Sequence, residues 1–592
     1  MICTYGPLGY LIFFCFSSYT GVWSLYTLLI LVFVNCAGIC LAARRLSCPL
    51  QALALALLVW AAANTENRTD LVVDLGLFSW ALLCHFGSGR RLAMCASVLV
   101  VLAAFLSLAK TSFLVLTPLL LLFLSIELYL RGCRRVGLIL MPAYLFLFLL
   151  GWLLAAQSVF NLPIFLSLSL SVVQSYNQAL GTEGQAFAAD LGRMVLLLSI
   201  PAVLIRGLMS SEAFDGGSNR VQWLRRLALL CWAGLLVLGN WKHGFVRFDA
   251  GHAPLALGFV PPAMILLETI PCISRPALYS ARGFAFAAAA LSLFILHHVF
   301  FGDLATSLAS PFRVFGMNIA DVACPFRYRE RMKSALAGLK QEVQLPALRS
   351  IVGTNSVDVF GQFQGDALDN GLNYYPRPSF QSYAASDRRL MALNEAFYLS
   401  PAAPDYVLYK PFVLDQKVPA LEDAWVLRAL LVNYVPVAAE RDYNLFRRLR
   451  TEPPQLRQVS DTIIQPGERI PLPLDIASNF WLELDLQPTI LGRIEQFIFK
   501  PSAVRLEAWD TNRNLLLRRR APPIMLEAGF LAAPLIIKTN DVLAAYDLQP
   551  RIQPAAYSLH LLPHDRPYWR SHARARVYVI DNLIGPAARV SN

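Results

Sequence analysis

The feature that most constrains this chain is a series of long apolar runs that fills its first 303 residues. A helix needs roughly 20 apolar residues to cross the hydrocarbon core of a bilayer, and most of the runs approach that length. Residues 1–303 are therefore predicted to form a polytopic α-helical membrane domain with about ten spans. The predicted spans are residues 21–42, 50–63, 71–86, 92–109, 111–130, 136–156, 191–208, 227–241, 257–272 and 283–303.

Arginine gathers in every second loop between these runs, as at Arg44 and Arg45 and again at Arg90 and Arg91. Cytoplasmic loops of membrane proteins carry this excess of positive charge. The alternate loops, and everything after residue 303, are therefore expected on the extracytoplasmic side. Because so much of the net charge of +12 lies in these loops, the lipid bilayer is the expected partner and nucleic acid is not.

After residue 303 the charges, prolines and alternating patterns of a water-soluble region begin. Residues 304–450 combine a helix-like segment at 328–343 with strand-like segments at 348–360 and 404–410, which predicts an extracytoplasmic α/β domain. The two prolines of "TEPPQ" (451–455) stop both helix and strand, and they mark the end of this domain.

Residues 451–592 carry short strand-like segments at the spacing of a β-sandwich, and we expect a jelly-roll-like module. The predicted strands are residues 480–486, 503–510, 514–520, 534–539, 557–562 and 575–580. Such modules often bind carbohydrate, but a fold alone assigns no function. Trp481 and Trp509 are expected to be core or strand aromatics rather than a platform for sugar.

One polar stretch stands out among the apolar runs, "GNWKHGFVRFDAGHAPLAL" at 239–257. It places Lys242, His243, Arg247, Asp249 and His252 in an expected outer loop. Arginine binds phosphate through two parallel hydrogen bonds, and histidine moves protons near neutral pH, so this set suits a lipid-linked phosphate. The alternative is anchoring of the cations at the membrane interface. A divalent cation is a third alternative, although the spacing matches no zinc motif.

Three further groups of polar residues are candidates. Lys110 lies between two apolar runs, where an ionisable group is either functional or reaches out to the interface. Asp74 lies inside a predicted span, so it needs a partner such as Lys110 or Arg68. In the long outer loop 156–193, Gln174 and Tyr176 either bind sugar hydroxyls or belong to a capped amphipathic helix.

The sequence has no phosphate-binding Walker loop, no dinucleotide fingerprint after a strand, no zinc ligand set and no nucleophile elbow. Cytosolic nucleotide chemistry is therefore not expected. If the protein is an enzyme, its activated substrate arrives in the membrane.

Several stretches resemble a group of uncharacterised bacterial polytopic membrane proteins with a large extracytoplasmic C-terminal domain. They are residues 3–11, 161–180, 242–252, 373–385 and 403–410. More distantly, "YGPLGYL" (5–11), which begins with Tyr5, resembles the stretch after the first outer loop of GT-C superfamily glycosyltransferases. "KHGFVRFDAGH" (242–252) is similar to the outer loops of O-antigen polymerases and ligases.

The resemblance implies an enzyme of the bacterial inner membrane that transfers a saccharide from a polyprenyl-phosphate carrier to a glycan acceptor. Lys242 and Arg247 would hold the carrier phosphate, His243 or His252 would act as acid or base, and Asp249 would orient a histidine. GT-C enzymes also use an acidic residue in the first outer loop. Here that loop would precede Thr4, so the resemblance implies a further span and acid upstream of Met1.

A different class of function fits the same features. The protein would then be a non-catalytic membrane component of polysaccharide export or assembly, with a glycan-binding outer domain and other polysaccharide-assembly proteins as partners. No cofactor other than the divalent cation considered above is expected from either hypothesis.

Overall fold

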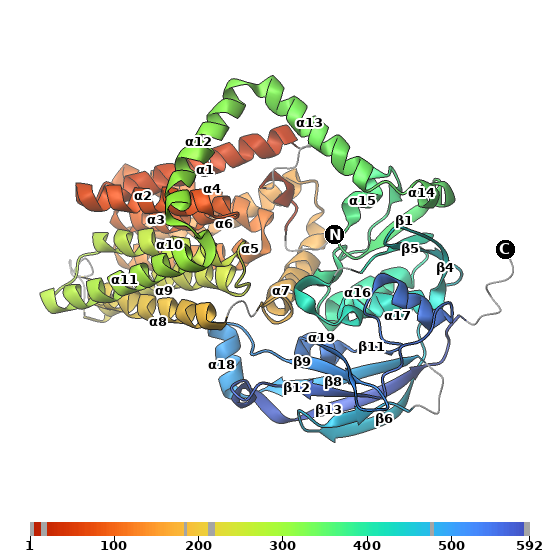
Figure 1. The fold of residues 1–592 in the computed structure, drawn as a ribbon. Helices are drawn as coiled ribbons and strands as arrows, with labels where there is room; N and C mark the ends of the chain where they lie inside the picture. Colours follow the sequence, from red (N-terminus) through yellow and green to blue (C-terminus); the bar gives the residue numbers. More distant parts are fainter. Residues whose placement is uncertain are drawn as a thin grey trace. The chain divides into compact units, whose positions relative to one another are not determined.

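The structure is a computed structural model that describes residues 5–12, 21–182, 186–210, 219–411, 413–473 and 479–584 (Figure 1). The chain divides into two compact units. The helical unit comprises Tyr5–Pro163 and Thr182–Arg329, and the strand-rich unit comprises Ile164–Gly181 and the chain from Glu330 onward. The helical unit thus continues beyond the boundary predicted at residue 303.

Each apolar run predicted as a span coincides with a helix of the helical unit. The helices are α1 (Gly21–Ala43), α2 (Cys48–Asn64), α3 (Arg68–Phe86), α4 (Gly89–Ala109), α5 (Thr111–Leu130), α6 (Arg134–Leu154), α8 (Ala186–Leu208), α9 (Asn219–Phe245), α10 (Ala253–Leu266) and α11 (Arg275–Ile295), which continues as η5 (Leu296–Phe301). Among the described residues, nine helices are long and apolar enough to cross a membrane, as a multi-pass membrane protein requires. The helices α2 and α10 are shorter, with 17 and 14 residues.

The helices of this unit differ in how much of their surface the protein covers. α3 and α10 are buried almost all round, whereas α1 and α6 expose large apolar side chains such as Phe33 and Leu154. At Gly76 of α3, a Cβ atom would lie 2.0 Å from Oδ1 of Asn35 on α1. Only glycine therefore permits the close packing of these two helices, as is common between helices in membranes.

The helical unit ends with α12 (Leu304–Ala323) and the first residues of α13 (Pro325–Glu342). α12 starts after Gly302, whose φ of 67° turns the chain, and the carboxylate of Asp303 caps it by accepting a hydrogen bond from the backbone N–H of Thr306 at 2.8 Å. α13 confirms the helix predicted at 328–343.

The strand-rich unit contains a five-stranded mixed sheet in the order β2-β1-β3-β5-β4. β2 (Asn373–Tyr374), β1 (Ser356–Phe360) and β3 (Tyr406–Tyr409) are parallel, and β5 (Tyr443–Arg448) and β4 (Tyr434–Glu440) add to β3 as an antiparallel hairpin. Helices α14 (Pro346–Val352), α15 (Gln364–Asp369), α16 (Arg388–Tyr398) and α17 (Ala424–Asn433) accompany the sheet.

The rest of this unit forms two four-stranded antiparallel sheets, in the orders β10-β9-β12-β7 and β11-β8-β13-β6. The strands of the first sheet are β10 (Leu515–Arg520), β9 (Arg505–Trp509), β12 (Ala556–His560) and β7 (Arg469–Pro471). Those of the second are β11 (Phe530–Ala533), β8 (Phe480–Pro488), β13 (Trp569–Ile580) and β6 (Leu456–Ile464). Helices α18 (Ile490–Ile498) and α19 (Pro523–Ala528) connect strands of these sheets.

Buried side chains of both sheets join those of α16 and α17 in one hydrophobic core, in which Trp481 is fully buried, as predicted. The boundary predicted after residue 450 lies in the gap between β5 and β6. The strand predicted at 534–539 is wrong. The strand at this place is β11, which ends at Ala533, because Pro534 has no N–H to continue the ladder.

The predicted outer loop 156–193 contains the helix α7 (Leu162–Ala179). With the turn before it, Val159–Ala179 is long and apolar enough to count among the nine candidate spans. However, Leu168, Val172 and Ala179 belong to the core of the strand-rich unit, and Ser171 donates a hydrogen bond to Asp387 of that unit. From Ile164 onward, α7 is therefore a packing element of the strand-rich unit.

A buried ionic network holds the strand-rich unit together; we call Asp358, Arg377, Asn394, Tyr398 and Asp423 the Arg377 cluster. Arg377 donates to the carboxylates of Asp358 and Asp423, at 2.8 Å each. The hydroxyl of Tyr398 donates to Asp358 at 2.7 Å, and the amide of Asn394 donates to Asp423 at 2.8 Å. All five side chains are fully buried, so water has no access to the cluster.

Candidate functional site

The helical unit brings one lysine, one histidine, one asparagine and two aspartates together where the ends of four helices meet. We call Asp70, Asp74, Lys110, Asn240 and His243 the Lys110 cluster. The aspartates lie in the first two turns of α3, Asn240 and His243 lie in the last two turns of α9, and Lys110 is the one residue between α4 and α5. Lys110 has extended backbone angles (φ −144°, ψ 133°), so the two helices meet at a break that this residue fills.

The contacts of the cluster form a continuous chain. Nζ of Lys110 lies 2.8 Å from Oδ2 of Asp70 and 2.7 Å from Nε2 of His243. On the other side of the imidazole ring, Nδ1 of His243 lies 3.4 Å from Oδ2 of Asp74. That same Oδ2 accepts a hydrogen bond from the side-chain amide of Asn240 at 2.9 Å.

These distances are compatible with one tautomer of a neutral His243 ring. An ammonium group at Lys110 has only donors, so in this arrangement Nε2 of His243 accepts from it. Nδ1 then carries the proton and points it at Asp74. The ring is therefore held as a neutral tautomer with a carboxylate behind it, which is the arrangement in which a histidine can accept a further proton at Nε2.

The exposure of the side chains decreases along the cluster toward Asp74. The side chains of Asp70, Lys110 and His243 are 13 to 19% exposed, whereas that of Asp74 is 3% exposed. Oδ1 of Asp74 is buried and has no hydrogen-bond partner among the described residues. The Lys110 end of the chain is therefore partly exposed, while Asp74 is buried at its inner end. An incompletely paired carboxylate inside an apolar helix is costly and is typical of a functional site.

The loop after α9 adds a second group of charged residues. Nε of Arg247 donates to Oδ2 of Asp249 at 3.1 Å, and Nδ1 of His252 lies 2.8 Å from Oδ1 of Asp249. Burial alone would raise the pKa of Asp249, but the hydrogen bond and the charge of His252 and the charge of Arg247 lower it below its usual value. Asp249 thus contacts both Arg247 and His252, and its predicted role of orienting a histidine stays a prediction.

The stretch that begins with Tyr5 runs across the end of α4. Tyr5 pairs with Lys110 in an isolated β-bridge, and the N–H groups of Gly6 and Leu8 donate to the carbonyl groups of Ala109 and Leu108. A Cβ atom at Gly6 would lie 2.3 Å from the carbonyl oxygen of Leu108. Glycine is therefore needed for this close approach, which places the backbone of Tyr5 beside that of Lys110.

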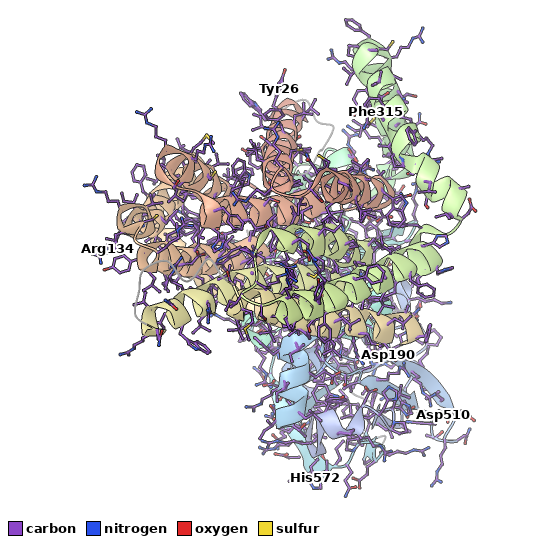
Figure 2. All side chains as sticks on the ribbon, turned by 90° about the vertical axis from the view of Figure 1, so that its left-hand side faces the viewer. Tyr26, Arg134, Asp190, Phe315, Asp510 and His572 are labelled. Atoms are coloured by element: carbon purple, nitrogen blue, oxygen red, sulfur yellow. The ribbon has the colours of Figure 1, made fainter. Side chains whose placement is uncertain are left out.

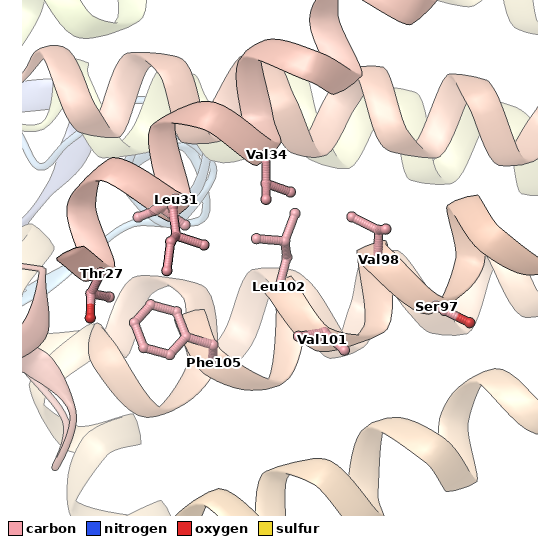
Figure 3. A pocket seen from close by; sticks show the side chains of 9 residues that line it. Thr27, Leu31, Val34, Ser97, Val98, Val101, Leu102 and Phe105 are labelled. Atoms are coloured by element: carbon pink, nitrogen blue, oxygen red, sulfur yellow. The ribbon is translucent and has the colours of Figure 1, made fainter.

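An apolar cavity of about 450 Å³ lies between α1 and α4 (Figure 3). Its lining is aliphatic and aromatic except for Thr27 and Ser97, and Figure 3 shows Leu31 and Val34 of α1 facing Leu102 of α4. The cavity reaches Phe105, five residues before Lys110 and thus about 7.5 Å from it along the helix axis. Its lining suits a hydrocarbon chain, because almost no polar group faces it.

The other predicted site residues have different surroundings. Lys242 is half-buried in the last turn of α9, next to His243. Gln174 and Tyr176 lie on α7 in the strand-rich unit, where Gln174 is exposed and Tyr176 packs against the core. Among the residues that the structure describes, no three His, Cys, Asp or Glu side chains are arranged to hold a metal ion.

The site residues predicted from the sequence did not include Asp70, Asp74 and Asn240. It did indicate that Asp74 requires a partner, but Lys110 pairs with Asp70, and the partners of Asp74 are His243 and Asn240. The spacing of Asp70 and Asp74, four residues apart on an otherwise apolar helix, was the available signal, since it places both carboxylates on one face.

Comparisons of this chain with protein-family models, with curated proteins and with solved structures gave no match. The assignment of a function therefore depends on the geometry of the site.

Proposed function

We propose that this protein is a membrane glycosyltransferase or polymerase that takes a saccharide from a polyprenyl-phosphate carrier at the outer face of the bacterial inner membrane. The observation that carries the proposal is the Lys110 cluster, in which a lysine joins Asp70 to a neutral His243 whose second nitrogen faces Asp74. Such a group supplies both a cation for phosphate and a base for a hydroxyl group.

Glycosyl transfer needs both a cation for the phosphate and a base for the acceptor hydroxyl group. The bond between the anomeric carbon and the phosphate oxygen breaks, and the phosphate departs with the electron pair and a growing negative charge. The acceptor hydroxyl forms the new bond to the same carbon and loses its proton. A cation near the phosphate and a base near the hydroxyl therefore lower the barrier at the same time.

In the proposed mechanism Lys110 moves from His243 to the phosphate, and this movement frees His243 to act as the base. When a carrier phosphate binds, the ammonium group of Lys110 turns toward it, with Lys242 and Arg247 as further candidates for this contact. Nε2 of His243 then loses its donor and can accept the proton of the acceptor hydroxyl. Asp74 stabilises the imidazolium ion that results, because its carboxylate already faces Nδ1.

The cavity between α1 and α4 supports a lipid-linked substrate. Its apolar lining suits an isoprenoid chain, and Phe105 at one end of the lining lies about 7.5 Å from Lys110 along the axis of α4. We further propose that the two four-stranded sheets of the strand-rich unit pack as a β-sandwich and that this unit positions the glycan acceptor.

The test is a substitution of His243 in the host cell. His243→Gln keeps a side chain of similar size but cannot accept and release a proton, so lipid-linked saccharide should accumulate and surface polysaccharide should become shorter or disappear. His572→Gln is the matched control, since His572 lies exposed on β13. Mass spectrometry of the lipid fraction and gel analysis of the polysaccharide give the readouts.

If His243→Gln, inserted at the level of the unsubstituted protein, gives polysaccharide of normal length and amount, the enzymatic proposal fails. The alternative of a non-catalytic export or assembly component would then be favoured.

A further inference from the structure

The helix α12 carries a continuous apolar stripe on its outer side. Six large apolar residues recur at intervals of three or four, which places them on one face of the helix. Their exposed fractions lie between 50% for Leu304 and 81% for Val322. The six residues are Leu304, Leu308, Phe312, Phe315, Ile319 and Val322.

The opposite face of α12 is polar and fixed to the helical unit. Ser310 donates a hydrogen bond to the carbonyl group of Ala63 on α2 at 3.1 Å. The side-chain amide of Asn64 donates to the carbonyl group of Ser307 at 3.0 Å. Since both serines are buried in this contact, α12 cannot rotate its apolar stripe inward without breaking it.

This arrangement reverses the usual one. An amphipathic helix on a soluble domain turns its apolar face to the core, whereas α12 turns a polar face to its own unit and an apolar face outward. Figure 2 labels Phe315 on the surface of α12. An exposed apolar surface that extends over 20 residues, or about 30 Å of helix, requires a partner.

Two observations identify the bilayer as that partner. α12 begins only two residues after the candidate span Arg275–Phe301, so its first turn lies where the chain leaves the membrane. The start of α13 is rich in cations, with Arg327, Arg329, Arg331 and Lys333 against the single acid Glu330. Apolar and basic segments in succession are typical of helices at the surface of anionic membranes.

We propose that α12 is an interfacial helix, with its apolar stripe buried at the boundary between lipid headgroups and acyl chains. The stripe then fixes the depth of the helical unit in the bilayer, and the basic start of α13 contacts the headgroups. This inference is independent of glycosyl transfer, since it uses no residue of the Lys110 cluster.

The test measures the depth of single residues of α12 in the full-length protein. Nitroxide labels are attached at Phe312→Cys, Phe315→Cys or Arg313→Cys after replacement of the native cysteines, and the protein is reconstituted in phosphatidylcholine and phosphatidylglycerol vesicles. Arg313 is the matched control because it is exposed on the opposite face of the same turn. Collisions of the label with oxygen, which partitions into lipid, and with a water-soluble nickel chelate are then compared.

We expect the ratio of oxygen to nickel collisions to be several-fold higher at positions 312 and 315 than at position 313. Equal ratios at all three positions would overturn the proposal. Labels at 312 and 315 that are shielded from both reagents would also overturn it, because protein, such as a second copy of the chain, would then cover the stripe. Where a label disturbs folding, judged by size-exclusion chromatography, Val322→Cys probes the far end of the same stripe.

Discussion

The Lys110 cluster of the helical unit and the Arg377 cluster of the strand-rich unit contain similar residues but differ in how these residues are connected and exposed. Both pair one cation with two aspartates. In the Arg377 cluster the guanidinium group contacts both carboxylates directly and every side chain is fully buried. In the Lys110 cluster a histidine stands between the lysine and the second aspartate, and three of the side chains remain partly exposed.

The difference separates a structural network from a candidate site. A buried ion pair without access to solvent can stabilise or specify a fold, but it cannot meet a substrate. A partly open cluster with a neutral histidine at its centre can bind an anion and move a proton. The comparison therefore predicts that substitutions in the Lys110 cluster reduce activity, and that substitutions in the Arg377 cluster reduce stability.

The largest effect is expected for Asp74→Asn. Asparagine keeps the shape and can still accept from Asn240, but it cannot stabilise an imidazolium ion at His243. We expect the rate of saccharide transfer to fall about 10²- to 10⁴-fold, with little change in thermal unfolding. Transfer is measured with lipid-linked donor and the protein in vesicles. An equal loss of stability and activity would place Asp74 with the structural residues instead.

The next effect is expected for Arg377→Met. Removal of the guanidinium group leaves Asp358 and Asp423 buried without a cation, which should cost about 3–5 kcal/mol of stability in the strand-rich unit. Denaturant unfolding and limited proteolysis of the full-length protein measure this loss. Arg457→Met is the control, since Arg457 pairs with Asp581 at the surface and its removal should change little. If the two variants unfold alike, the buried network contributes no more than a surface pair.

A smaller effect concerns pH. Burial raises the pKa of Asp423 to about 7, although Arg377 and Asn394 oppose the shift. Since an aspartate in an unfolded chain has a pKa of about 3.9, the folded state holds an extra proton between these values. The free energy of unfolding should therefore fall by up to about 4 kcal/mol as the pH rises from about 4 to about 7.

Asp423→Asn mimics the protonated carboxyl group, and its amide takes the place of Oδ1, which has no hydrogen-bond partner among the described residues. The variant should lose this part of the pH dependence while it keeps most of the stability found at low pH. An unchanged slope of stability against pH would show that another group is responsible.

The smallest effect is expected in the cavity between α1 and α4. Val101→Asn makes its lining polar at a half-exposed position, and the affinity for a long-chain carrier should fall by about 1 kcal/mol, or roughly fivefold. Ile139→Asn on α6 is the control, because Ile139 is equally exposed but lies outside the cavity. The comparison uses carriers with long and short isoprenoid chains, and an equal loss in both variants would exclude a specific role of the cavity.

Local patterns predicted the elements of this fold, and distant contacts explain what they missed. The apolar runs located the helices of the helical unit because length and hydrophobicity are properties of one segment. The packing of α7 could not be predicted in this way, because Leu168 and Val172 lie in a core built from strands far along the chain. The strand predicted at 534–539 was wrong because the prediction gave the apolar residues of this segment more weight than Pro534, which ends the ladder.

The candidate site was predicted in part for the same reason. Asp249 and His252 are three residues apart, so their contact could be anticipated. The contact of Lys110 with His243 spans 133 positions and depends on how α4, α5 and α9 pack, which no local pattern reveals. The charged stretch at 239–257 therefore suggested that the loop after α9 is the centre of the candidate site. The structure adds the two aspartates of α3 to it.

The most direct test of the central claim is whether the Lys110 cluster binds the phosphate of a lipid carrier. Native mass spectrometry of the purified protein, released from lipid nanodiscs with a polyprenyl monophosphate, measures the bound fraction. We predict a one-to-one adduct that is lost in Lys110→Met, is kept in Lys340→Met near the end of α13, and does not form with the polyprenol that lacks phosphate. An adduct of equal strength in Lys110→Met would contradict the account.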